Sequence, residues 1–175
     1  MVLTDPIPEQ YRTLVDHFIA TARGIAEKGE AIQSMLFIGS LEKGQFVSVL
    51  MDADNADEKE SAGEHARRVA AMLNADYSMM VGEAWALTPR DTARSDAILD
   101  DYGSIGNYPG RIEIAAFMLE TRYGMWGGQA ALKFKGASKK KRTFGKVEFL
   151  KVDSGEGRLA NIIQKDSDAS KATMQ

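Results

Sequence analysis

Two glutamates, Glu83 and Glu113, are the residues of this sequence best suited to acid–base chemistry. Each lies in a segment with the pattern of a β-strand, and Glu83 shares its strand face with Val81, where a sheet would bury it. Two carboxylates on neighbouring strands could hold a divalent ion, which makes a metal-dependent hydrolase one candidate function. The alternatives for Glu83 are a raised pKa, an ion pair with Arg111 or Arg122, and an edge position facing water.

Composition excludes most other catalytic chemistry. The 175 residues include no cysteine, which excludes disulfides, thiolate zinc sites and cysteine nucleophiles. There are two histidines, His17 and His65, and we expect a structural role for each. The acidic run 52–57 lacks the ligand and the glycine that an EF-hand needs at its fifth and sixth positions. We therefore expect no bound metal, no cofactor and no catalytic residue, and we favour a protein without enzymatic activity.

A basic segment interrupts an otherwise acidic chain. Residues 133–146 hold seven basic and no acidic residues, which leaves 15 basic and 25 acidic residues elsewhere. Clustered cations suit contacts with a phosphate backbone, and a nearby aromatic ring can stack on a base. The candidate binding residues are Lys139, Lys140, Lys141, Arg142 and Phe144. The alternative is a solvated loop whose lysines keep a strand edge from pairing with other chains.

Residues 90–110 show neither helical nor strand periodicity. Loops this long without regular structure are uncommon in a compact domain and are often functional. Because the segment is acidic, we interpret it as a binding surface for a protein partner, with plain disorder as the alternative. Its candidate binding residues are Asp96, Asp100, Asp101 and Tyr102.

Periodicity and turn signals predict the elements that position these residues. Apolar residues three and four positions apart predict helices over 6–28 and 57–74. Apolar or alternating runs predict strands over 33–40, 45–51, 77–87, 111–121, 125–135 and 146–152, and a short strand or one helical turn over 159–163. The continuous run Met35-Leu36-Phe37-Ile38 favours a strand that is covered on both faces.

These elements predict the fold class. Short connections between neighbouring strands imply antiparallel pairing. We predict a single α+β domain over 1–164, with the order α-β-β-α-β-β-β-β, a mainly antiparallel sheet of about six strands, and both helices on one face. A polar and flexible tail is expected over 165–175. The absence of a long apolar run and of a secretory signal predicts a cytoplasmic protein without a membrane partner.

Three short segments carry a resemblance to other proteins. They are Val-Gly-Glu-Ala-Trp at 81–85, Arg-Ile-Glu-Ile at 111–114 and Gly-Met-Trp at 124–126. In these segments the chain resembles small uncharacterised α+β proteins of phages and bacterial mobile elements. The resemblance implies an accessory role, and it assigns no activity and no site residue.

We therefore expect a non-enzymatic accessory protein, encoded by a phage or mobile element, that acts through protein–protein contacts. Its expected partner is another protein or a second copy of itself, bound through a sheet edge in a homo-oligomer. The first alternative is a nucleic-acid-associated factor that uses the basic segment 133–146. The second alternative is the metal-dependent hydrolase with Glu83 and Glu113.

Overall fold

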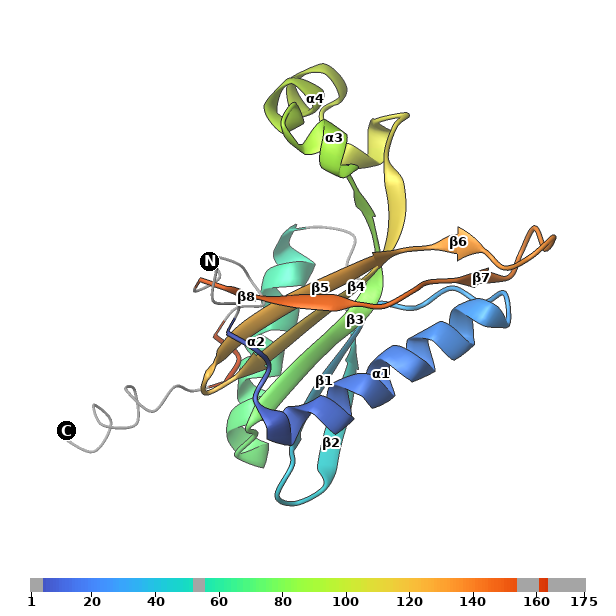
Figure 1. Cartoon of the computed structure of the whole chain (residues 1–175). Coiled ribbons are helices and arrows are strands. Elements are labelled where there is room, and N and C mark those ends of the chain that lie inside the picture. The colour runs from blue at the N-terminus through green and yellow to red at the C-terminus, as the bar shows by residue number, and fades with distance from the viewer. Residues whose placement is uncertain (1–4, 52–55, 154–160, 164–175) are drawn as a thin grey trace.

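The computed structural model describes residues 5–51, 56–153 and 161–163 (Figure 1). Six strands form one antiparallel sheet in the order β2-β1-β3-β4-β5-β8. They are β1 (Met35–Ser40), β2 (Gln45–Leu50), β3 (Tyr77–Ala86), β4 (Ile112–Thr121), β5 (Gly124–Ala131) and β8 (Glu148–Val152). The predicted α+β fold with a six-stranded antiparallel sheet is confirmed. The predicted tail 165–175 lies outside the described residues.

Helix α1 (Glu9–Glu27) packs on one face of the sheet, which we call the α1 face. Its buried side chains recur every three or four residues, as the amphipathic pattern predicts. They contact alternate residues of the central strands, including Met79, Phe117 and Trp126. The helix ends before Gly29, whose φ of 85° is easily adopted by a residue without a Cβ.

Helix α2 (Ala56–Leu73) packs on the opposite face, the α2 face, where Ala66 and Ala70 contact Leu36 and Ile38 of β1. The prediction that both helices share one face is therefore wrong, and Figure 1 shows the sheet between them. The reason lies in β1, whose intervening residue Phe37 packs on the α1 face. Successive strand residues point to opposite faces, so this apolar run needs a cover on both.

The irregular loop that the sequence predicts over 90–110 is not found, because residues 87–111 fold into short helices. They form the helical lobe, which contains α3 (Pro89–Thr92), α4 (Ser95–Tyr102) and the 3-10 helix η1 (Ile105–Asn107). In Figure 1 this lobe stands away from the sheet, beyond the ends of β3 and β4. Within α4 only Ile98 is buried, so one apolar contact in an eight-residue helix leaves no periodic pattern for sequence analysis to detect.

The basic segment forms a second extension. Strands β6 (Lys133–Phe134) and β7 (Arg142–Thr143) pair as a separate two-stranded sheet, and we call residues 133–143 the basic hairpin. The strand predicted over 125–135 therefore ends at Ala131. Of the segment predicted over 159–163, residues 161–163 are described and lie in neither a strand nor a helix, although Ile162 and Ile163 are buried.

One position in β1 tests the packing of the sheet. A Cβ on Gly39 would lie 2.5 Å from the carbonyl oxygen of Gln45 and 2.6 Å from the hydroxyl of Tyr77. We expect Gly39→Ala to lower the free energy of unfolding by about 1–3 kcal/mol, because backbone atoms must move to admit the methyl group. Urea denaturation measures this change.

The control is Gly24→Ala in the interior of α1, where the new methyl group would meet no atom within 4 Å. We expect it to raise stability by about 0.5–1 kcal/mol through helix propensity. Equal effects of the two substitutions would contradict the packing described for β1.

Candidate functional site

The structure brings Glu83 and Glu113 together, but an arginine lies between them. Arg142 of the basic hairpin places Nη2 2.5 Å from Glu83 Oε1 and Nη1 3.0 Å from Glu113 Oε2. The backbone N–H of Ile32 also donates to Glu83 Oε1, at 2.9 Å. We call Arg142, Glu83 and Glu113 the arginine clamp. The partner of Glu83 is therefore neither Arg111 nor Arg122.

The arginine clamp does not fit a catalytic carboxylate pair. Its hydrogen bond to Glu83 raises the pKa of the Arg142 guanidinium, so the cation stays charged between the two acids. Both oxygens of Glu83 accept hydrogen bonds from protein groups. The geometry instead joins the base of the basic hairpin to β3 and β4. Arg111 lies elsewhere, with its guanidinium 4.5 Å from the ring centre of Trp85.

A second contact ties the basic hairpin to α1. Glu27 accepts a hydrogen bond from Thr143 Oγ1 at 2.7 Å, and it forms an ion pair with Lys135, whose Nζ lies 3.0 Å away. The hydrogen bond from Thr143 is the main cause that lowers the pKa of the Glu27 carboxyl. Two ionic contacts therefore hold the base of the hairpin, while Lys139, Lys140 and Lys141 are exposed toward its tip.

Two of the residues predicted to contact nucleic acid are held within the fold. Arg142 is held in the arginine clamp, and its side chain is 15% exposed. Phe144 is 3% exposed, and its ring centre lies 6.0 Å from that of Phe117. The guanidinium of Arg23 lies over the ring of Phe144. The ring that does reach solvent is Phe134, which is 66% exposed.

The acidic residues predicted to bind a protein partner lie on one short helix. Asp96, Asp100, Asp101 and Tyr102 all lie on α4 and are exposed. The ring of Tyr102 meets that of Tyr108 at 5.3 Å. The lobe thus presents carboxylates close together on an ordered surface.

Strand β2 forms a surface that the sequence analysis did not select. It is an edge of the sheet, and Phe46, Val47 and Leu50 are exposed large apolar residues, Phe46 by 56% and Leu50 by 54%. The register with β1 puts Phe46 and Leu50 on the α1 face and Val47 on the α2 face. The available signal was an apolar strand that lacks the alternation with charged residues typical of a solvated edge.

An apolar groove of about 600 Å³ lies beside this edge on the α1 face. Residues of α1, of the segment 30–33 and of β1 line it, among them Met35 and Phe37. The ring of Phe37 lies 5.7 Å from that of Phe46, so the groove and the exposed face of β2 are continuous. Phe18 of α1 forms part of one wall of the groove, and its ring centre lies 4.5 Å from that of Phe37.

The opposite edge of the sheet, β8, has a different character. It carries Glu148 and Lys151, and Lys151 Nζ lies 2.5 Å from Asp5 Oδ2. Charged side chains on an edge strand oppose pairing with another chain. Strand β2 carries no charged residue and no proline, so the two edges differ in the feature that controls pairing.

Comparisons with known proteins identify no family. No family model matches the chain, no curated protein matches it in sequence, and no solved structure matches its fold. In the described part of the chain, no helix combines the length and the apolar character needed to cross a membrane. Within the same residues, no group of three His, Cys, Asp or Glu side chains is arranged to hold a metal ion.

The arginine clamp predicts a stability effect. We expect Arg142→Met to lower the free energy of unfolding by about 1–3 kcal/mol, because it leaves two partly buried carboxylates without their counter-charge. Lys141→Met is the matched control, since the adjacent side chain is exposed and lies outside the clamp.

Adding Glu83→Gln to Arg142→Met should cost less than the sum of the two single changes, because the partners interact directly. Chemical denaturation of the four proteins measures the coupling. Strict additivity, or an equal loss in the Lys141 variant, would contradict the clamp.

Proposed function

We propose that this chain is a non-enzymatic accessory protein that acts through protein–protein contacts and pairs with itself along β2. The observation that carries the proposal is the open, apolar and uncharged edge of the sheet at β2. The resemblance to proteins of phages and mobile elements supports an accessory role in such a system.

The sequence of β2 favours a second copy as the occupant of this edge. The residues Phe46-Val47-Ser48-Val49-Leu50 have the same apolar pattern in both directions about Ser48. An antiparallel pair centred on Ser48 would place Phe46 opposite the partner's Leu50 and Val47 opposite the partner's Val49. Because opposed residues point to the same face, the first pair lies on the α1 face and the second on the α2 face.

A two-fold axis through Ser48 also satisfies the symmetry of a closed dimer. Each copy presents the same strand, so the interface is isologous and leaves no free β2 edge that could extend a filament. The two sheets become one, and both α1 helices lie on the same side of it. The apolar grooves of the two copies then adjoin across the paired strands, and the exposed rings of Phe46 are covered.

A charge-exchange experiment tests the pairing. Ser48 is exposed on β2, so substitutions there should leave the fold intact. We expect Ser48→Lys and Ser48→Asp each to weaken self-association by about tenfold or more, because like charges would meet on the axis. An equal mixture of the two variants should recover the dimer. Light scattering coupled to size-exclusion chromatography over a dilution series measures both results.

The matched control is Leu150→Lys on β8, which places a charge on the other edge of the sheet at a residue that is 59% exposed. We expect it to leave association unchanged. A wild-type monomer at every concentration, or a mixture of the Ser48 variants that stays monomeric, would overturn the proposal.

The basic hairpin supports a second candidate function, binding of single-stranded nucleic acid. Three exposed lysines lie toward its tip, Phe134 is exposed, and two ionic contacts hold its base. We expect anisotropy of a labelled oligonucleotide to show binding that weakens steeply with salt. Neutralising Lys139, Lys140 and Lys141 to Gln should abolish it.

Its control neutralises three exposed cations on the helices, Arg12, Lys59 and Arg68, and thereby changes net charge by the same amount. Equal losses in the two triple variants would show that the hairpin contributes no specific contact. Retained binding in the hairpin variant would have the same meaning.

A further inference from the structure

The apolar groove beside β2 has the size and the lining of a site for a small molecule. Its volume of about 600 Å³ is within the range of roughly 300–1,000 Å³ that is usual for such sites. Small-molecule sites are mostly apolar and carry a few polar groups that orient the ligand. Eight of the eleven residues that line this groove are apolar, and the other three are Thr21, Glu30 and Gln33.

Aromatic packing forms the floor of the groove. The ring centres of Phe18 and Phe37 lie 4.5 Å apart, and this contact joins α1 to β1. The buried residue Val81 of β3 also belongs to the lining. Ile25, Met35 and Phe37 are partly exposed, so they provide the apolar surface that a ligand would cover. Covering such a surface is favourable in proportion to its area.

The segment 30–33 forms another wall, and backbone hydrogen bonds fix it. The N–H of Glu30 donates to the carbonyl of Ile25 at 3.2 Å, which keeps the chain close to the end of α1. Two residues later the N–H of Ile32 donates to Glu83 Oε1 at 2.9 Å. The arginine clamp therefore positions this wall as well as the basic hairpin. A wall that is already ordered lowers the entropic cost of binding.

The groove carries one charge. Glu30 is the single charged residue of its lining, and it is exposed. In the described part of the chain, Glu30 belongs to none of the ion pairs. Gln33 of the same segment and Thr21 of α1 add neutral hydrogen-bonding groups. A carboxylate beside an apolar surface attracts a cation and repels an anion.

We propose that the apolar groove binds a small amphipathic amine, whose apolar body covers Met35 and Phe37 and whose ammonium group lies at Glu30. An ammonium group has three hydrogen-bond donors, so the oxygens of Gln33 and Thr21 can accept from it as well. The proposal does not rest on pairing along β2, since no residue of that strand lines the groove.

Three probes that share one apolar skeleton isolate the effect of the charge. They are phenethylamine, phenethyl alcohol and hydrocinnamate, which carry a cationic, a neutral and an anionic group. We expect titration followed by nuclear magnetic resonance at low, constant ionic strength to show saturable binding of the amine. Its affinity should exceed that of the alcohol by about threefold or more, as befits an exposed ion pair. Hydrocinnamate should bind most weakly, and added salt should reduce the differences.

Substitution of Glu30 tests the origin of this order. Glu30→Gln removes the charge from an exposed side chain of the same length, so the fold should be retained. We expect the amine to lose its advantage over the alcohol, whose own affinity should stay within about twofold of the wild-type value. The matched control is Glu42→Gln, which removes the same charge from an exposed residue outside the groove. It should preserve the advantage of the amine.

Two measurements locate the apolar body of the probe. Met35→Ala should weaken the binding of the amine and the alcohol by a similar factor, because both lose the same contact. In the wild-type protein the methyl signals of Ile25 and Met35 should shift as the amine saturates, and this readout serves if Met35→Ala fails to fold. The methyl signals of Leu150, which is 59% exposed on β8, should stay in place.

The proposal fails if the amine does not bind saturably, or if the alcohol or hydrocinnamate binds as tightly as the amine. It also fails if the amine keeps its advantage in Glu30→Gln, or if Glu42→Gln removes that advantage to the same extent. Equal shifts of the Leu150 and Met35 signals would show general adhesion to apolar surface and would likewise exclude a site in the groove.

Discussion

The sheet of this protein is apolar on both faces along β1 and β3, and most of the architecture follows from that constraint. Leu36 and Ile38 require a cover on one face and Phe37 and Met79 require one on the other, so α2 and α1 must lie on opposite sides. Helix α1 covers the central strands as far as Trp126 of β5, and its Phe18 contacts Phe37 of β1, whereas β2 remains largely exposed. The apolar groove and the exposed edge of β2 are therefore two consequences of one arrangement.

The arginine clamp gives the second organising interaction. A carboxylate within a largely buried strand face is costly unless a cation and hydrogen bonds compensate it, and Arg142 and the N–H of Ile32 do so for Glu83. The compensation has a structural result, because Arg142 belongs to the basic hairpin and Glu113 to β4. The same residues that suggested a catalytic pair instead determine where the hairpin leaves the sheet. The helical lobe begins at the far ends of β3 and β4 and is not part of this contact.

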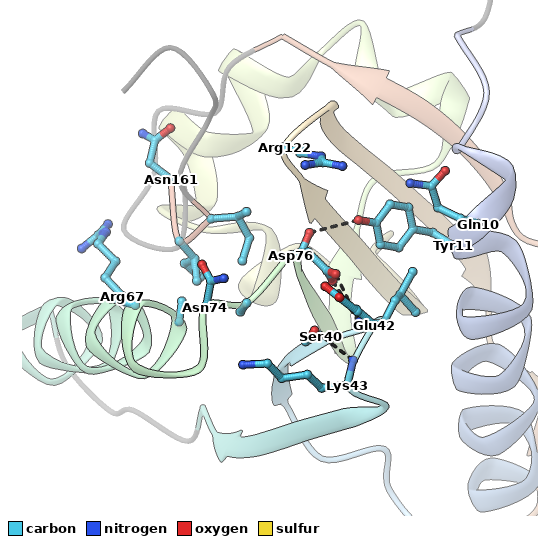
Figure 2. Close-up of a pocket in the computed structure, with 16 residues that line it drawn as sticks. Gln10, Tyr11, Ser40, Glu42, Lys43, Arg67, Asn74, Asp76, Arg122 and Asn161 are labelled. Carbon is cyan, nitrogen blue, oxygen red and sulfur yellow. Dashed lines mark hydrogen bonds between the residues drawn. The ribbon is translucent and has the colours of Figure 1, made fainter. Parts of the chain in front are cut away.

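The two long helices and the six strands of the sheet were predictable from the sequence, because each carries a local repeat of apolar residues. The prediction that α2 shares a face with α1 was wrong because the apolar side of a helix does not specify which side of a sheet it covers, although the continuous run in β1 already required two covers. The partner of Glu83 was not predictable from the sequence, because Arg142 is 59 residues away along the chain and only the folded hairpin brings it near. A pocket of about 680 Å³, which lies where the start of α1, the β1–β2 turn and the end of α2 meet (Figure 2), has no sequence signature for the same reason, as its lining comes from five separate segments.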